Sequence, residues 1–121
     1  MGLDMYLTIK TEQGDFEAAY WRKANQIHDW FVQNVQDGVD ECDEYLVTAE
    51  QLTSLVETCQ KVLANRDLAE ELLPTTSGFF FGSTDYDQYY FDDLKNTIEK
   101  ITVALDRYSG IGTQFYYQSS W

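Results

Sequence analysis

The sequence predicts an α+β fold: a small antiparallel or mixed sheet of three to five strands, with about three helices packed on one face. Three observations favour it. Residues 3–10 alternate between apolar and polar side chains, the period of a half-buried strand. Apolar residues recur at helical spacing in three later stretches, 21–35, 52–63 and 90–105. Strands stand at both ends of the chain and helices between them, an order typical of a sheet with helices on one side.

The whole chain, residues 1–121, is expected to form a single domain. Its 121 residues suit one domain, and a hydrophobic content of 44% is ample for one compact core. Pro74 is the only proline, and no Ser/Gly-rich linker divides the chain.

The first third of the chain is expected to form a hairpin and a helix. The buried face of the first strand would carry Leu3, Met5, Leu7 and Ile9. Residues 12–15 would turn, and residues 16–20 would return as a short strand. Helical spacing begins at Trp21 and predicts a helix over 21–35, which Gly38 would end in a left-handed cap.

The elements that follow are predicted mainly from capping signals. After an acidic loop, 37–44, and a short strand, 45–47, Thr48 and Gln51 form the capping box of a second helix that ends near Asn65. Asp67 is expected to cap a short helix over 68–73, which Pro74 closes. Residues 79–81 are expected to be extended, Ser83 or Thr84 to cap a third helix, and residues 113–118 to form the last strand.

The formal net charge is −13, and this balance limits the classes of partner. Direct binding of DNA, RNA or an anionic membrane needs a basic surface, so none of these is expected. A basic protein, such as the cleft of a nucleic-acid enzyme, is permitted, and so is a purely solubilising role of the acidity. Cys42 and Cys59 show no pattern of a disulfide framework, which favours a cytoplasmic setting. We expect neither a signal peptide nor a membrane span.

Aromatic residues gather in two parts of the chain. Seven of nineteen lie in residues 78–91 and four more in residues 115–121. Because Tyr and Trp carry a polar group that needs a partner when buried, this density favours a recognition surface over a generic core.

A ligand site is predicted around the run Tyr20-Trp21-Arg22-Lys23, which joins two large rings to two of only eight bases. Rings can stack on a planar group, and Arg and Lys can hold phosphate. The alternative is that Arg22 and Lys23 only neutralise nearby carboxylates. The expected ligand-binding residues are Tyr20, Trp21, Arg22, Lys23, Asn25, His28, Ser77, Phe80, Ser83, Tyr117, Gln118, Ser120 and Trp121. For His28, a hydrogen-bonded structural role is favoured; a catalytic role would need a partner brought in by folding, such as Asp29 or an acid of the third helix.

A second, acidic set of residues would serve a protein-binding function instead. It comprises Asp37, Asp40, Glu41, Asp43, Glu44, Asp85, Asp87, Asp92 and Asp93. The loop 37–44 lacks the order of a calcium-binding loop, and a lone histidine builds no familiar metal set, so we expect no metal or cofactor. No catalytic signature occurs, so the sequence does not favour an enzyme.

Several strings in the chain resemble a family of small uncharacterised bacteriophage and prophage proteins. The strings are Met1-Gly2-Leu3-Asp4-Met5-Tyr6-Leu7, Tyr20-Trp21-Arg22-Lys23-Ala24-Asn25, Ser77-Gly78-Phe79-Phe80-Phe81-Gly82-Ser83-Thr84 and Tyr117-Gln118-Ser119-Ser120-Trp121. The resemblance implies a phage or prophage source, the cytoplasm of an infected bacterium, and by analogy a role against host defence.

Three functions are compatible with these observations, and the first is favoured because it rests on specific aromatic and polar residues, whereas the second needs only diffuse charge. The first is an accessory protein that sequesters a small anionic, nucleotide-like immune signal in the aromatic and Arg/Lys pocket. The second is an acidic nucleic-acid mimic that inhibits a basic host protein such as a nuclease. The third is a phage structural or assembly component, with a homo-oligomer as an open alternative.

Overall fold

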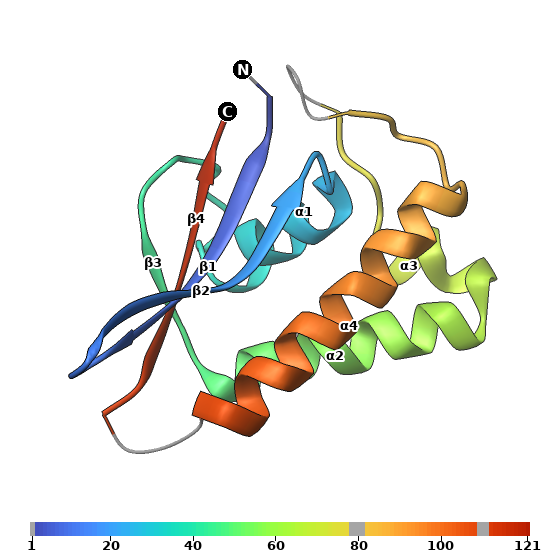
Figure 1. The fold of residues 1–121 in the computed structure, drawn as a ribbon. Helices are drawn as coiled ribbons and strands as arrows, with labels where there is room; N and C mark the ends of the chain where they lie inside the picture. Colours follow the sequence, from blue (N-terminus) through green and yellow to red (C-terminus); the bar gives the residue numbers. More distant parts are fainter. Residues whose placement is uncertain (1, 78–81, 109–111) are drawn as a thin grey trace.

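A computed structural model describes residues 2–77, 82–108 and 112–121, and over these residues the fold is a four-stranded antiparallel sheet with helices on one face (Figure 1). The predicted α+β class is confirmed. The strand order is β2-β1-β4-β3. The strands are β1 (Asp4–Thr11), β2 (Gly14–Arg22), β3 (Tyr45–Val47) and β4 (Gln114–Ser120), and the helices are α1 (Asn25–Asn34), α2 (Ala49–Ala64), the short 3₁₀ helix η1 (Arg66–Leu68), α3 (Ala69–Leu72) and α4 (Gln88–Tyr108).

The β1–β2 hairpin contains a bulge that keeps its apolar residues on one face. Leu7 pairs with Ala19 and Thr8 with Glu17, so Ala18 is the extra residue. Because a bulge shifts the alternation by one, Phe16 lies opposite Ile9 on the same face as Trp21. β1 pairs on its other side with β4, where Leu7 lies opposite Tyr117.

The first helix begins later than the sequence predicted. Trp21 belongs to β2 and pairs with Met5, so α1 starts at Asn25 instead of Trp21. Pairing with β1 continues the strand, and this long-range interaction overrides the helical spacing. Gly38 has the predicted left-handed conformation, with a φ of 81°, and donates its N–H to the Val32 carbonyl at 2.8 Å, but it is not the cap of α1, which is Val35.

The capping box of α2 is confirmed. The Gln51 N–H donates to Thr48 Oγ1 at 3.1 Å, and the Thr48 N–H donates to Gln51 Oε1 at 2.9 Å. The prediction that Asp67 caps the next short helix is wrong, because the side chain of Asn65 accepts the N–H of Asp67 instead.

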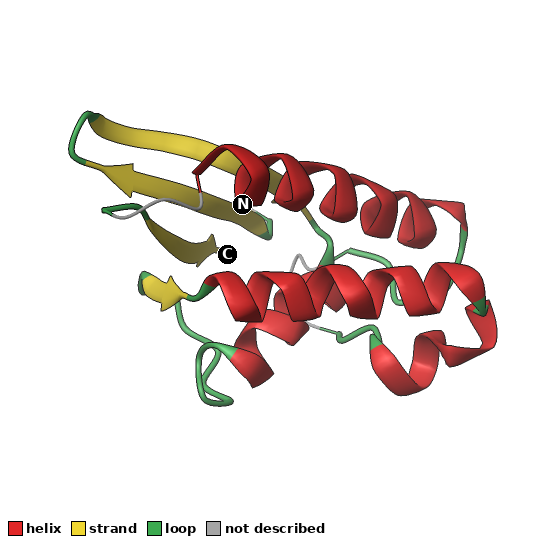
Figure 2. Ribbon diagram, turned by 90° about the horizontal axis from the view of Figure 1, so that it is seen from below, coloured by secondary structure: helices red, strands yellow, loops and turns green. Residues whose placement is uncertain are grey.

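The start of α4 also differs from the prediction. Neither Ser83 nor Thr84 caps it: Ser83 Oγ accepts the Asp85 N–H in a turn, and Asp87 accepts the Tyr90 N–H at 3.1 Å. The helix therefore begins at Gln88. The expected extended run 79–81 lies outside the described residues. Figure 2 shows α4 running beside α2, both on the helical side of the sheet.

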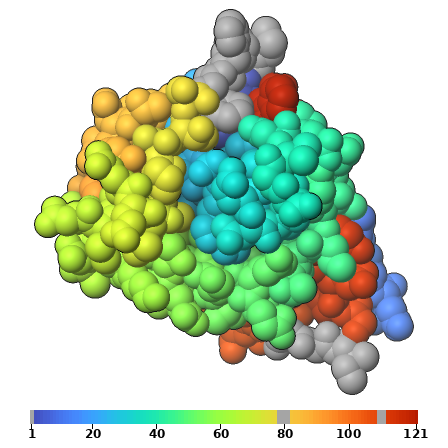
Figure 3. Space-filling model, turned by 180° about the vertical axis from the view of Figure 1, so that it is seen from behind, coloured from blue at the N-terminus to red at the C-terminus, as the bar shows by residue number. Residues whose placement is uncertain are grey.

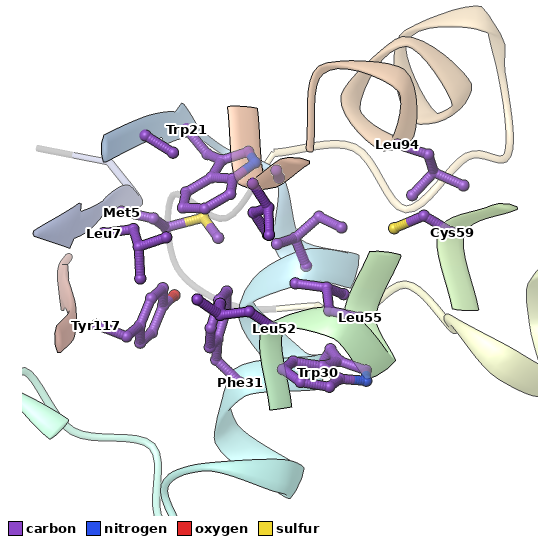
Figure 4. Packing of buried hydrophobic residues seen from close by; sticks show 14 of the residues in the cluster. Met5, Leu7, Trp21, Trp30, Phe31, Leu52, Leu55, Cys59, Leu94 and Tyr117 are labelled. Carbon is purple, nitrogen blue, oxygen red and sulfur yellow. The ribbon is translucent and has the colours of Figure 1, made fainter. Parts of the chain in front are cut away.

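The core is built around a stack of aromatic rings between the sheet and α1 (Figure 4). The rings of Phe31 and Tyr117 are 3.8 Å apart and nearly parallel, at 8°. Trp30 meets Phe31 edge-on at 5.3 Å, and Trp21 does so at 6.0 Å. Tyr90 and Phe91 are also buried. Several of the aromatic residues that the sequence assigned to a recognition surface therefore form the interior.

Candidate functional site

The run Tyr20-Trp21-Arg22-Lys23 lies at the end of β2, where the alternation of the strand directs its side chains to different faces. Tyr20 is 42% exposed on the open sheet face, where its hydroxyl donates to Asp4, whereas Trp21 is 2% exposed on the core face. Arg22 is exposed, and Lys23 turns the chain with a φ of 57°. Successive residues of a strand point to opposite faces, so these four side chains cannot line one pocket.

Trp21 has a structural role. Its indole N–H donates to Thr97 Oγ1 of α4 at 2.8 Å, and both residues are buried. This bond fixes α4 against the sheet and satisfies the polar group of the ring. The expectation that Trp21 stacks on a ligand is corrected, since the ring is enclosed by the core.

His28 and Tyr117 also lie inside the protein, with both side chains fully buried. The Tyr117 hydroxyl lies 2.6 Å from His28 Nδ1, and Asp40 Oδ1 lies 2.8 Å from His28 Nε2. In the neutral ring, Nε2–H donates to the carboxylate and Nδ1 accepts from the hydroxyl. Burial, followed by the Asp40 charge, raises the pKa of Tyr117. The buried, hydrogen-bonded His28 agrees with the favoured structural role. The carboxylate beside it is Asp40 of the acidic loop; neither Asp29 nor an acid of the third helix, the partners considered for a catalytic role, takes that place.

A cleft between β2 and the start of α4 brings some of the predicted residues together. It has a volume of about 270 Å³ and is lined by Arg22, Lys23, Gln26, Gly82, Ser83, Asp85, Asp87, Tyr89, Tyr90 and Asp93. Asn25 is buried nearby: its Nδ2 donates to the Ser83 carbonyl at 2.8 Å, and its Oδ1 accepts the Thr76 N–H at 3.0 Å. Asn25 therefore joins the segment at Thr76 to the segment at Ser83, and Ser83 lines the cleft.

The charges of this cleft do not suit a phosphate. Arg22 and Lys23 share it with Asp85, Asp87 and Asp93, and neither base forms an ion pair among the described residues. Three carboxylates outnumber two cations, so an anionic ligand would meet net repulsion.

Asp93 is the most perturbed carboxylate of the cleft. Burial raises its pKa from 3.8 to about 6, the hydrogen bond from Gln26 opposes this rise, and Asp92 and Asp87 add to it. Between about pH 4 and 6 the folded chain keeps a proton that the unfolded chain has lost. Asp93 therefore lowers the free energy of unfolding as pH rises through this range.

We expect Asp93→Asn to raise the free energy of unfolding by about 1–2 kcal/mol at neutral pH, with a gain that shrinks as the pH falls toward 5. Urea unfolding at the two pH values measures it. Asp92→Asn is the matched control, since Asp92 is exposed and bonded to Gln88. Equal effects of the two variants at both pH values would contradict the role given to burial.

The remaining predicted ligand residues are dispersed. Gln118 donates to the Cys42 carbonyl at 3.0 Å, Ser120 and Ser77 are exposed, and Trp121 is 49% exposed. Phe80 lies outside the described residues. Gln118, Ser120, Ser77 and Trp121 do not line the cleft described above.

The acidic loop 37–44 is held by its backbone, which leaves most of its carboxylates at the surface. Gln36 Nε2 donates to the Val39 carbonyl at 2.8 Å, and Ser119 Oγ donates to the Glu41 carbonyl at 3.4 Å. Asp37 and Asp43 are exposed, while Asp40 binds His28 and Glu44 pairs with Lys10 at 2.6 Å. Hydrogen bonds therefore hold the backbone of the loop, while most of its carboxylates are exposed.

Charge is segregated along the chain, a signal that the sequence reading missed. No Lys or Arg occurs in residues 24–60 or in residues 67–94, which together contain 15 of the 21 acidic residues. Figure 3 shows one face on which α1 and its following loop lie at the centre, with α2 and the 67–77 segment around them. We call this surface, formed by residues 24–60 and 67–77, the acidic face.

The acidic face has few internal counter-charges. Over the part of the chain that the structure describes, the ion pair between Lys10 and Glu44 is the only one that joins a Lys or Arg to a carboxylate. Nor do the described residues contain a group of His, Cys, Asp or Glu arranged to hold a metal ion. No helix among them is long and apolar enough to cross a membrane.

Comparison with known proteins gives no assignment. No family model, curated protein or solved structure matches the chain.

Proposed function

We propose that the protein is an acidic binding module whose acidic face occupies a basic surface of another protein. The single observation that carries this proposal is the segregation of charge: the segments of that face hold eleven acidic residues and no Lys or Arg. Carboxylates with few internal partners gain most from a basic surface, and an excess of one sign of charge accelerates encounter with a surface of the opposite sign.

Sequestration of a nucleotide-like ligand is less well supported. Trp21, His28 and Tyr117 are enclosed in the core, and Arg22 and Lys23 share their cleft with three carboxylates. The geometry thus favours the second of the three functions over the first.

The distribution of acidic and basic residues indicates the class of partner. Segments that carry eleven acidic residues and no base of their own offer carboxylates where a nucleic acid offers phosphates, so a nucleic-acid-binding cleft is the best match. The resemblance to phage and prophage proteins would make the partner a bacterial host protein, such as a nuclease.

The test compares two variants that each remove four charges. The face variant carries Asp37→Asn, Asp43→Asn, Glu70→Gln and Glu71→Gln, and the control variant carries Glu12→Gln, Asp15→Asn, Glu17→Gln and Glu99→Gln, all at exposed positions. Wild type and both variants serve as bait for bacterial lysate, and duplex DNA is added as a competitor.

We expect wild type and the control variant to retain the same nucleic-acid-binding protein, and duplex DNA to displace it. The face variant should bind that protein about 10- to 100-fold more weakly, because four exposed charge pairs are lost. Equal retention by both variants, or retention that DNA does not affect, would contradict the proposal.

A further inference from the structure

A small hollow opens in the acidic face between α1 and α3. It has a volume of about 160 Å³, and its lining consists of Gln26, Asp29, Trp30, Gln33, Asn34, Leu72, Leu73 and Pro74. Sites for drug-sized ligands are about 300–1,000 Å³, so this hollow is of a size for one side chain. We call it the α1–α3 hollow.

Trp30 gives this hollow an unused hydrogen-bond donor. The residue is 8% exposed, and its indole N–H donates to no acceptor among the described residues but reaches solvent. The N–H of Trp21, in contrast, is buried and donates to Thr97. In Figure 4 the indole nitrogen of Trp30 lies at the end of the ring that faces away from the Phe31–Tyr117 stack. The polar edge of an otherwise buried ring can donate to an acceptor supplied from outside in place of water.

The rim of the hollow offers acceptors. The amide nitrogen of Gln33 is directed to Asp29 at 3.5 Å, and that of Asn34 donates to the Trp30 carbonyl at 2.8 Å. Neither amide oxygen accepts a hydrogen bond from another described residue, and Asp29 lines the same hollow. Leu72, Leu73 and Pro74 supply apolar surface on the other side.

We propose that the α1–α3 hollow binds one arginine side chain of the basic partner. A guanidinium presents five donors and no acceptor, which matches the Asp29 carboxylate and the two amide oxygens. The methylene stem packs on Leu72 and Pro74, as the stems of long basic side chains do on apolar surface. The backbone carbonyl of the arginine residue accepts the Trp30 N–H.

This inference rests on the proposed function, since it assigns one contact point within the acidic face. An arginine anchored in a small pocket, surrounded by weaker charge contacts, is the usual arrangement of a binding hot spot. An anchored arginine would also fix one orientation of the partner, which dispersed carboxylates on the acidic face would not do alone.

The test uses defined peptides and isotope-labelled protein observed by NMR. The probes are N-acetyl-Gly-Arg-Gly-amide, the same peptide with citrulline, which is isosteric and neutral, and the same peptide with lysine. We expect the arginine peptide to give saturable shifts of the Trp30 indole and of the Asp29 and Gln33 amides. The citrulline peptide should give none, and the lysine peptide should bind at least about threefold more weakly because it lacks the planar fork.

Three variants at exposed or half-exposed positions accompany the titration, and the same spectra report whether each is folded. Asp29→Asn should weaken arginine binding about fivefold, and Gln33→Glu should tighten it about threefold by adding a carboxylate to the rim. Glu50→Gln, which removes one charge elsewhere on the face, should change it less than about twofold. Equal effects of Asp29→Asn and Glu50→Gln, or equal binding of arginine and lysine, would overturn the assignment.

A nona-arginine peptide separates this proposal from the function on which it rests. If nona-arginine shifts residues over the acidic face while the single-arginine peptide gives no saturable shift, the hollow is not an arginine site and the proposed function stands. If neither peptide perturbs the acidic face, both proposals fail.

Discussion

Replacing Phe31 with Ala is expected to lower the free energy of unfolding by about 3–5 kcal/mol, which is typical of a buried aromatic ring. Phe31 is fully buried and contacts the rings of Tyr117, Trp30 and Trp21. Its removal leaves a cavity at the point where the sheet meets α1, and the surrounding rings cannot all close it. Urea unfolding followed by circular dichroism measures the loss.

Phe16→Ala is the matched control for this prediction. Phe16 is 43% exposed and stacks only on Tyr108 among the described rings, so its removal should cost less than about 1 kcal/mol. If Phe31→Ala were as mild as Phe16→Ala, the aromatic residues would not form the core described above, and an aromatic recognition surface would again be the better interpretation.

The second large effect is expected for Tyr117→Phe, which should lower the free energy of unfolding by about 1–3 kcal/mol. The substitution removes a buried hydroxyl and leaves His28 Nδ1 without that partner at 2.6 Å. The ring and its stack on Phe31 are retained, so the loss reports the polar contact rather than a cavity. Thermal and urea unfolding both measure it.

Tyr116→Phe, one residue earlier, controls for the loss of a hydroxyl as such. Its hydroxyl bonds to Gln114 at 3.0 Å in an exposed position, and solvent can replace that bond. We expect a change within about 0.5 kcal/mol. If both substitutions lowered the free energy of unfolding equally, the hydrogen bonds that link Asp40, His28 and Tyr117 would not stabilise the fold.

Local signals in the sequence predicted much of the fold. The alternation of residues 3–10 and the Thr48–Gln51 capping box each depend on neighbouring residues alone, and both are confirmed in β1 and α2. The boundaries that the sequence placed wrongly depend on distant partners. Trp21 fits helical spacing with the residues that follow it, but pairing with Met5 extends β2 through it.

The candidate site was harder to predict than the fold. The residues grouped as a ligand pocket were chosen by chemical type, and strand alternation and burial then separated them. The partner of His28 could not be foreseen, because Asp40 reaches it only through the path of the loop after α1. The absence of Lys and Arg from residues 24–60 was readable without any structure, but its importance follows only from the face that these residues form.

The most direct test of the central claim is the salt dependence of binding to the partner captured by the wild-type chain. Affinities would be measured by calorimetry at several salt concentrations for wild type, the face variant and the control variant. We expect a steep loss of wild-type affinity with salt, a shallower slope for the face variant, and an unchanged slope for the control. An affinity that does not depend on salt, or a slope that both variants reduce equally, would contradict it.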